Sequence, residues 1–283
     1  GEGDGHLLLL KSKNIRGAEL MLDFHAAMYG GRYSEAVKAA ERMALLSSTS
    51  QMFDVKIFVD AQLCRSLALM EAGEFEGARD LLEATFEVAF RSGLRGECLR
   101  GLLLSGKLYL AIGEAQSALP YVLSALRQSE KMGMELVRME AVLSLAHIWH
   151  ALHQGPKALS LLRLHWGGGF DKGSLELRAR ANLLMALLID NKNDKDSLGG
   201  KKEKRSGAGA RVKGGGEMVL VHLEAAREAA ARAGHTQILM EAQWLLAVTC
   251  ARCGKREQRD THAAELNHLL RSKERHGAIG LQG

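Results

Sequence analysis

The sequence predicts an all-α solenoid built from about six antiparallel helix pairs. Leu and Ala dominate a chain of 283 residues that has only two prolines, and unbranched side chains of this kind favour helices. Apolar residues recur at helical spacing, as in Leu99, Leu102, Leu103 and Leu110. A turn motif also recurs about every forty residues, which is the period of a helical-repeat architecture.

The recurring motif is a turn that opens on Gly and closes on Ala. It occupies residues 31–36, 73–78 and 113–118, and a variant over 152–158 carries Pro156 in the first turn of the next helix. The closing alanines lie 42, 40 and 40 residues apart. Each turn therefore joins the two helices of one pair.

A column of small residues lies twelve positions before the closing alanines and allows two helix backbones to approach closely. Its members are Ser66, Gly106 and Ala146, with Ala186 one period further along. A large residue follows three positions later in each pair: Leu69, Tyr109, Trp149 and Ile189. The next match is Ala247, which lies 61 residues after Ala186 and so predicts an insertion of about one extra loop.

The insertion coincides with a basic, Gly-rich segment, residues 191–216, which we expect to be disordered. It holds eight basic and three acidic residues and so accounts for the whole net charge of +5. The remainder is neutral, and the bulk charge predicts no nucleic-acid face. We expect the repeat domain to span 14–275, with frayed ends at 1–13 and 276–283.

The expected helices form six pairs. Their spans are 14–29 with 33–47, 54–72 with 75–92, 94–112 with 115–132, 135–153 with 156–165, 173–190 with 217–233, and 235–253 with 256–272. Gly167, Gly168 and Gly169 predict a helix stop followed by a loop. Because the first residue is Gly1 and not Met, we also expect a piece of a longer protein.

These residues resemble the tetratricopeptide (TPR) signature. Its spacing is occupied by Leu102, Gly106, Tyr109, Ala118 and Ala125, and again by Leu145, Ala146, Trp149 and Ala158. The resemblance implies a right-handed superhelix. The period of 40 exceeds the usual TPR period of about 34, which keeps HEAT repeats as an alternative.

A closer resemblance is to the family of anaphase-promoting complex subunit 5. It rests on the order of four segments, 117–126, 140–146, 157–162 and 253–259, and on the charged loop that interrupts the penultimate pair. It covers most of residues 50–275. The resemblance implies a non-catalytic platform subunit of a nuclear ubiquitin ligase that acts in mitotic cell-cycle progression, with cullin and RING subunits elsewhere performing ubiquitin transfer. It implies location in the nucleus and cytoplasm.

The first helices of successive pairs present a candidate partner-binding groove. In the TPR register its residues are Leu63, Leu103, Leu143 and Leu183, with Lys107, His147 and His150 beside them. An exposed stripe of this kind fits an apolar partner segment. The alternative is that the leucines pack against adjacent helices. We expect other protein subunits as partners, and no nucleic acid, membrane or small-molecule substrate.

The remaining chemical motifs have simpler interpretations. His147, His150 and His153 share a helix face, yet no second helix supplies an evident metal ligand, so we expect no metal. Cys250 and Cys253 have redox spacing but lie in a helical pattern, where cysteines pack as small apolar residues. The Gly-rich segment lacks a full phosphate-binding loop. We therefore expect no catalytic residue and no cofactor.

Several alternatives stay open at this level. The basic segment is interpreted as a solvated loop, a nuclear-targeting patch or, least favoured, a nucleic-acid contact, and Ser197 and Ser206 are candidate phosphorylation sites within it. For the whole chain, a generic TPR adaptor that binds peptides is the first alternative. An RNA-binding repeat protein is the second, and the leucines of the candidate groove argue against it.

Overall fold

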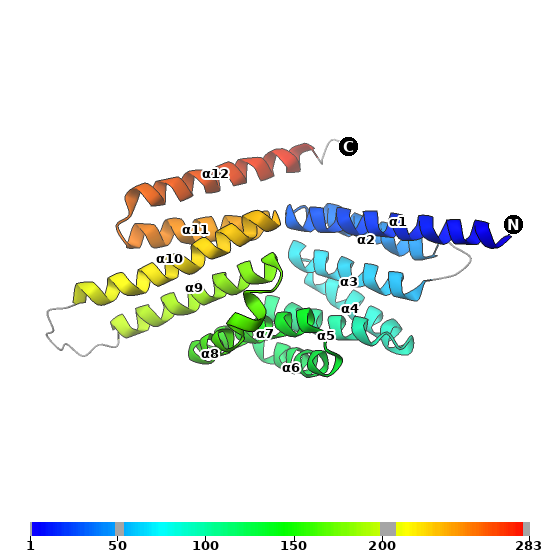
Figure 1. The fold of residues 1–283 in the computed structure, drawn as a ribbon, viewed down its shortest axis with the longest axis horizontal. Helices are drawn as coiled ribbons and strands as arrows, with labels where there is room; N and C mark the ends of the chain where they lie inside the picture. The colour runs from blue at the N-terminus through cyan, green and yellow to red at the C-terminus, as the bar shows by residue number, and fades with distance from the viewer. Residues whose placement is uncertain (1, 49–53, 199–207, 280–283) are drawn as a thin grey trace. The chain divides into compact units, whose positions relative to one another are not determined.

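The chain is an all-α TPR-like solenoid (Figure 1). The computed structural model describes the backbone of residues 2–48, 54–198 and 208–279, and the side chains of 15–48, 54–191 and 215–273. Every element in these ranges is helical. The chain divides into two compact units, Gly1–Ala141 and Val142–Gly283.

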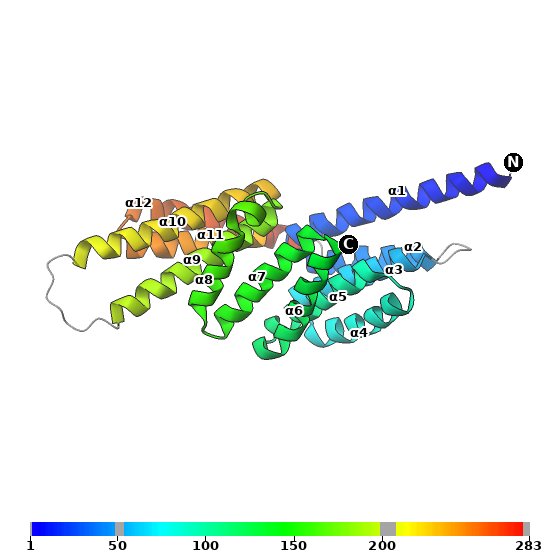
Figure 2. The ribbon, with the colours of Figure 1, turned by 60° about the horizontal axis from the view of Figure 1, so that its bottom comes forward.

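The first unit holds three complete helix pairs. They are α1 (Glu2–Tyr29) with α2 (Tyr33–Ser48), α3 (Val55–Ala72) with α4 (Phe75–Arg91), and α5 (Arg95–Ala111) with α6 (Ala115–Met132). Each helix from α1 to α6 packs against the next, and α3 also packs against α5. Figures 1 and 2 show α2 and α3 side by side in both views. The first helix of one pair therefore contacts the first helix of the next, as a solenoid requires.

Helix α7 (Glu135–Ala151) contains the division between the units. The other elements of the second unit are α8 (Gly155–His165), the π-helical turn η1 (Trp166–Phe170), α9 (Leu175–Leu198), α10 (Ala208–Ala233), α11 (Thr236–Arg252) and α12 (Arg256–Ile279). Helices α9 and α10 pair along their length in both views, and α9 also contacts α11 (Figures 1 and 2).

The twelve expected helices are confirmed, and most observed ends lie within two residues of the expected ones. Four ends extend further: α1 begins at Glu2, α9 runs to Leu198, α10 begins at Ala208 and α12 runs to Ile279. Helix α9 continues through 191–198 because no Gly or Pro interrupts it before Gly199. Residues 199–207, the centre of the expected disordered insertion, lie outside the described residues.

The expected helix stop is confirmed, since α8 ends at His165, but the loop expected over Gly167–Gly169 was wrong. The chain instead makes one π-helical turn from Trp166 to Phe170, closed by a hydrogen bond from the Asp171 N–H to the Trp166 carbonyl at 3.1 Å. Phe170 is fully buried at its end, and the Trp166 and Phe170 rings lie 6.1 Å apart. Burial of this apolar side chain holds three consecutive glycines in a helical turn that their own preference opposes.

The Gly of each turn motif has a structural cause. Gly73 and Gly113 end α3 and α5 with φ angles of 85° and 89°, a left-handed conformation that L side chains rarely adopt. The Glu114 N–H then donates to the Tyr109 carbonyl at 2.8 Å. One period later His153 occupies the same place with a φ of 59°. The turn geometry therefore persists where the glycine has been replaced.

The first four members of the column of small residues are buried. Ser66 and Ala146 are 0% exposed and Ala186 is 1% exposed, and Gly106 is buried too, whereas Ala247 is partly exposed. A Cβ atom placed on Gly106 would lie 2.5 Å from Val122 Cγ2 of α6 and 3.4 Å from the Ala118 carbonyl oxygen. Helices α5 and α6 therefore approach so closely that position 106 has room only for the hydrogen atom of a glycine side chain.

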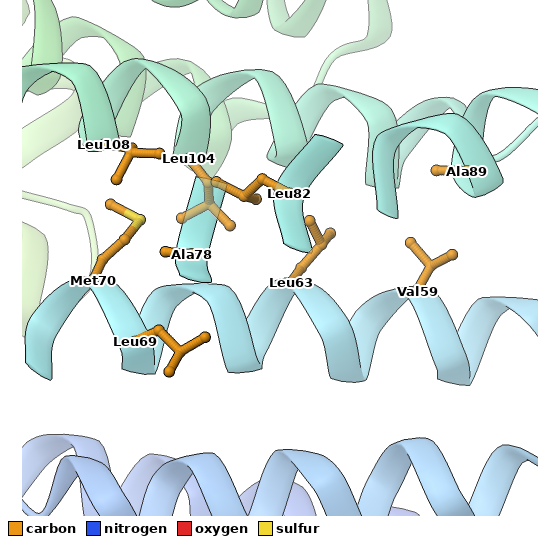
Figure 3. Packing of buried hydrophobic residues seen from close by; sticks show 9 residues of the cluster. All are labelled: Val59, Leu63, Leu69, Met70, Ala78, Leu82, Ala89, Leu104 and Leu108. Atoms are coloured by element: carbon orange, nitrogen blue, oxygen red, sulfur yellow. The ribbon is translucent and has the colours of Figure 1, made fainter. Parts of the chain in front are cut away.

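The core of the first unit lies between successive helices. Figure 3 shows Val59, Leu63 and Met70 extending from one face of α3. Met70 extends toward Leu108 of α5, and Leu63 and Val59 lie opposite Leu82 and Ala89 of α4. Leu69 extends from the opposite face of α3 (Figure 3). A second cluster joins the first two pairs through Phe24, the alanines of α2, and Cys64 and Ala68 of α3. Both faces of α3 are thus covered, one by each neighbouring pair.

Candidate protein-interaction surface

The four leucines of the expected groove, the leucine column, are buried. Leu63 and Leu103 are 1% and 3% exposed, and Leu143 and Leu183 are both 5% exposed. Leu63 and Leu103 belong to the first unit and Leu143 and Leu183 to the second. In the chain alone these side chains pack between helices, which is the alternative interpretation of the column. Partner binding through them stays a prediction.

The polar residues of the expected groove are partly exposed. Lys107 Nζ of α5 donates to Glu140 Oε2 of α7 at 2.8 Å, so its ammonium is paired within the first unit. His147 and His150 lie on α7, both partly buried. Burial, together with the charge of nearby His153, lowers the pKa of His150. His150 therefore favours its neutral form at neutral pH.

Two residues of the same surface are absent from the expected set. Adding the 61-residue step to Leu183 gives Trp244. Leu187 follows Lys107 and His147 in the forty-residue register, and adding 61 to it gives Val248. Both lie on α11, where Trp244 is 54% exposed and Val248 is 36% exposed. The register that located Ala247 would have found them, had it been extended to the leucine column.

A concave feature outside the expected groove lies in the first unit. A groove of about 310 Å³ is formed between α4, α5 and α6. It is lined by Arg79, Leu82, Glu83, Phe86, Leu102, Ser105, Leu108, Tyr109 and Tyr121. The Tyr109 and Tyr121 rings stack with centroids 5.2 Å apart, and Phe90, which is 72% exposed, stacks on Phe86 at 6.4 Å. Phe90 lies outside the groove lining. The groove itself combines partly exposed aromatic rings with charged groups, a mixture found at protein interfaces.

The cysteines differ sharply in their surroundings. Burial raises the pKa of the Cys64 thiol to about 11 and also raises that of Cys250, which is 1% exposed. Cys253 is exposed, and all four thiols are free. Cys250 therefore lacks the lowered thiol pKa that redox motifs use.

We expect iodoacetamide at pH 8 to modify Cys253 within minutes and to leave Cys64 and Cys250 unmodified until the chain is unfolded. The thiolate is the reactive form, and it is both scarce and inaccessible at the two buried positions. Peptide mass spectrometry of the native and the denatured protein measures the difference. Equal modification of Cys64 and Cys253 in the native protein would contradict the packing of α3.

Other kinds of site are not evident in the described residues. No group of three or more His, Cys, Asp and Glu side chains within 15–48, 54–191 and 215–273 is arranged to hold a metal ion. Among the helices that the structure describes, none combines the length and the hydropathy needed to cross a bilayer.

Comparison of the sequence with known proteins gives one relative, and comparison with solved structures supports the fold. No family model matches the chain. Anaphase-promoting complex subunit 5 of Arabidopsis thaliana is 25% identical over 182 residues, which are 64% of this chain and 20% of that protein. The chain therefore spans one fifth of the length of this relative.

Among solved structures, the apo form of RapI aligns with a TM-score of 0.58 and 13% identity, covering 91% of this chain and 85% of that chain. BtubC (BKLC) from P. vanneervenii aligns with a TM-score of 0.48 and 16% identity over 90% of this chain and 92% of that chain. At these identities RapI supports the fold alone. The chain is thus a TPR-like helical-repeat protein with sequence similarity to a subunit of the anaphase-promoting complex.

Proposed function

We propose that this chain is part of a non-catalytic platform subunit of the anaphase-promoting complex, a multisubunit ubiquitin ligase, and that it acts in the nucleus and cytoplasm during mitosis. The carrying observation is the similarity to subunit 5 over 182 residues, together with a forty-residue solenoid register. A solenoid of this kind works through extended surfaces.

The physical role follows from the stacking of the pairs. Each pair buries its apolar faces against its neighbours, so the surface residues of each unit are held at fixed spacing. Such a surface positions other subunits without chemistry of its own. Ubiquitin transfer then belongs to the cullin and RING subunits of the assembly.

The test is co-purification from a native lysate. A tagged full-length protein is isolated, separated by size-exclusion chromatography and identified with its co-eluting proteins by mass spectrometry. We expect elution far above the 30.8 kDa of this chain, in one stable peak with cullin and RING subunits. Recovery only as a free monomer would contradict the platform role.

A generic TPR adaptor is the second candidate, and the groove between α4, α5 and α6 favours it. Its aromatic and charged lining resembles a peptide-binding surface more than a flat subunit contact. An adaptor exchanges its partners, so the co-purified proteins would vary with the lysate and dissociate on dilution. A constant, dilution-resistant set of proteins favours the platform.

A further inference from the structure

The groove between α4, α5 and α6, which we call the aromatic groove, has a counterpart one repeat earlier, between α2, α3 and α4. Residues of α3 and α5 correspond at a step of 40, and residues of α2 and α4 at a step of 42. These steps match Arg65 of α3 with Ser105 of α5, and Glu41 of α2 with Glu83 of α4. The later place therefore keeps the carboxylate and has a serine where the earlier place has an arginine.

In the earlier place the arginine binds the carboxylate. Arg65 Nη2 of α3 lies 2.9 Å from Glu41 Oε1 of α2. The Nε atom of the same guanidinium is buried by neighbouring atoms. The arginine therefore joins α3 to α2 and neutralises the glutamate at this point of the repeat.

The aromatic groove has the carboxylate without such an arginine. Ser105 is short, and its hydroxyl donates to the Gly101 carbonyl of its own helix at 3.0 Å. In the part of the chain whose side chains are described, Glu83 forms no ion pair. Arg79 lines the groove one turn earlier on α4 and does not pair with Glu83 either, so it does not replace the missing partner.

The Glu83 carboxylate lies close to the two stacked tyrosines of the groove. A hydrogen bond with Tyr109 raises the pKa of Tyr121, and burial and the negative charge of Glu83 raise it further. Phe86 lines the same groove. A carboxylate beside partly exposed aromatic rings favours a planar cation, because one group can pair with the acid and also lie against the rings.

The apolar surface continues beyond the aromatic groove. Phe90 lies one turn after Phe86 on α4, stacks on it with ring centroids 6.4 Å apart and is 72% exposed. An apolar surface that extends from a groove across an exposed ring is typical of a contact with another protein. A free cation would leave Phe90 exposed, so the pattern favours a cation carried by a longer segment.

We propose that the aromatic groove binds an arginine side chain of a partner protein, whose guanidinium pairs with Glu83 and lies against the Tyr109 and Tyr121 rings. The guanidinium thereby takes the place that Arg65 holds one repeat earlier. Lysine fits less well, because its ammonium is strongly hydrated and has no planar face. The inference rests on the proposed function, since it names the chemistry of one segment that the scaffold would hold.

Peptide pools test the preference for arginine. Fluorescein-labelled heptapeptides, randomised except for a central residue fixed as Arg, Lys or Gln, are titrated with the protein and followed by fluorescence anisotropy. We expect the Arg pool to bind about tenfold more tightly than the Gln pool, with the Lys pool between them. Equal binding of the Arg and Gln pools would overturn the proposal.

Removal of the carboxylate tests the pairing with Glu83. Glu83→Gln should abolish the preference for the Arg pool, because the guanidinium loses its charged acceptor. Glu41→Gln is the matched control and should leave the preference unchanged, since that carboxylate is already paired with Arg65. A preference for arginine that survives Glu83→Gln would contradict the proposed site.

Ser105→Arg tests the groove by giving it the arginine of the earlier repeat. The new guanidinium should reach Glu83 as Arg65 reaches Glu41, and binding of the Arg pool should fall about tenfold. Ser105→Ala keeps the groove open and should bind as the wild type does. Circular dichroism melting of each variant confirms that the fold is retained. Undiminished binding by a folded Ser105→Arg chain would place the peptide elsewhere and overturn the proposal.

Two other occupants of the groove would also overturn the proposal. A dimer in analytical ultracentrifugation that Glu83→Gln dissociates would make a second copy the occupant. Pool binding that is lost in the full-length protein would make another segment of the same protein the occupant. Absence of the arginine preference with intact co-purification rejects only this site, and failure of co-purification rejects the platform role whatever the pools do.

Discussion

Replacing Leu63 with alanine is expected to lower the free energy of unfolding by about 2–5 kcal/mol. Leu63 is 1% exposed and lies in the cluster that joins α3, α4 and α5. The substitution removes buried apolar area and leaves a cavity at the contact with Gly101. Urea unfolding followed by circular dichroism measures the change.

Trp244→Ala is the matched comparison, since Trp244 holds the equivalent place on α11 but is 54% exposed. We expect it to change the free energy of unfolding by about 1 kcal/mol at most. If Leu63→Ala were as mild as Trp244→Ala, Leu63 would be a surface residue, and the interpretation of the leucine column as packing would be wrong.

Gly106→Ala is expected to destabilise the chain by up to about 2 kcal/mol. The added methyl would lie 2.5 Å from Val122 Cγ2, a branched side chain with little room to rotate, and 3.4 Å from the Ala118 carbonyl oxygen. Overpacking of this kind costs about 1–3 kcal/mol, and the better helix propensity of Ala offsets about 1 kcal/mol of it. The midpoint of urea unfolding reports the net loss.

Gly101→Ala, one and a half turns earlier on α5, serves as the control. Its nearest neighbour would be Phe86 Cδ2 at 3.5 Å, an ordinary contact, so only the propensity gain remains. The double variant Gly106→Ala with Val122→Ala should recover part of the loss, because the obstructing methyl is removed. A Gly106→Ala chain as stable as Gly101→Ala would refute the close approach of α5 and α6.

The helices and their period could be predicted from the sequence because both depend on local patterns. The turns are marked by Gly73 and Gly113, and the close contact by Gly106, since only particular residue types tolerate these positions. The same register extended across the insertion located Ala247. These features need no knowledge of distant contacts.

The exposure of individual residues could not be predicted in this way. Leu63 and Trp244 hold equivalent places in the repeat, yet one is buried by the next pair and the other is not. The difference depends on which other helices pack against each helix. The sequence of a single repeat carries no information about that. The π-helical turn was missed for a related reason, because burial of Phe170 overrides the preference of three glycines.

Within the first unit, both faces of α3 are covered by neighbouring helix pairs. Hydrogen–deuterium exchange of the protein, followed by mass spectrometry, measures that protection. We expect the amides of α3 and α5, where Leu63 and Leu103 are 1% and 3% exposed, to exchange slowly, and those of α11 around Trp244, which is 54% exposed, to exchange faster. Exchange of α3 as fast as that of α11 would show that the neighbouring pairs do not cover it, and the stacking of the pairs would be wrong.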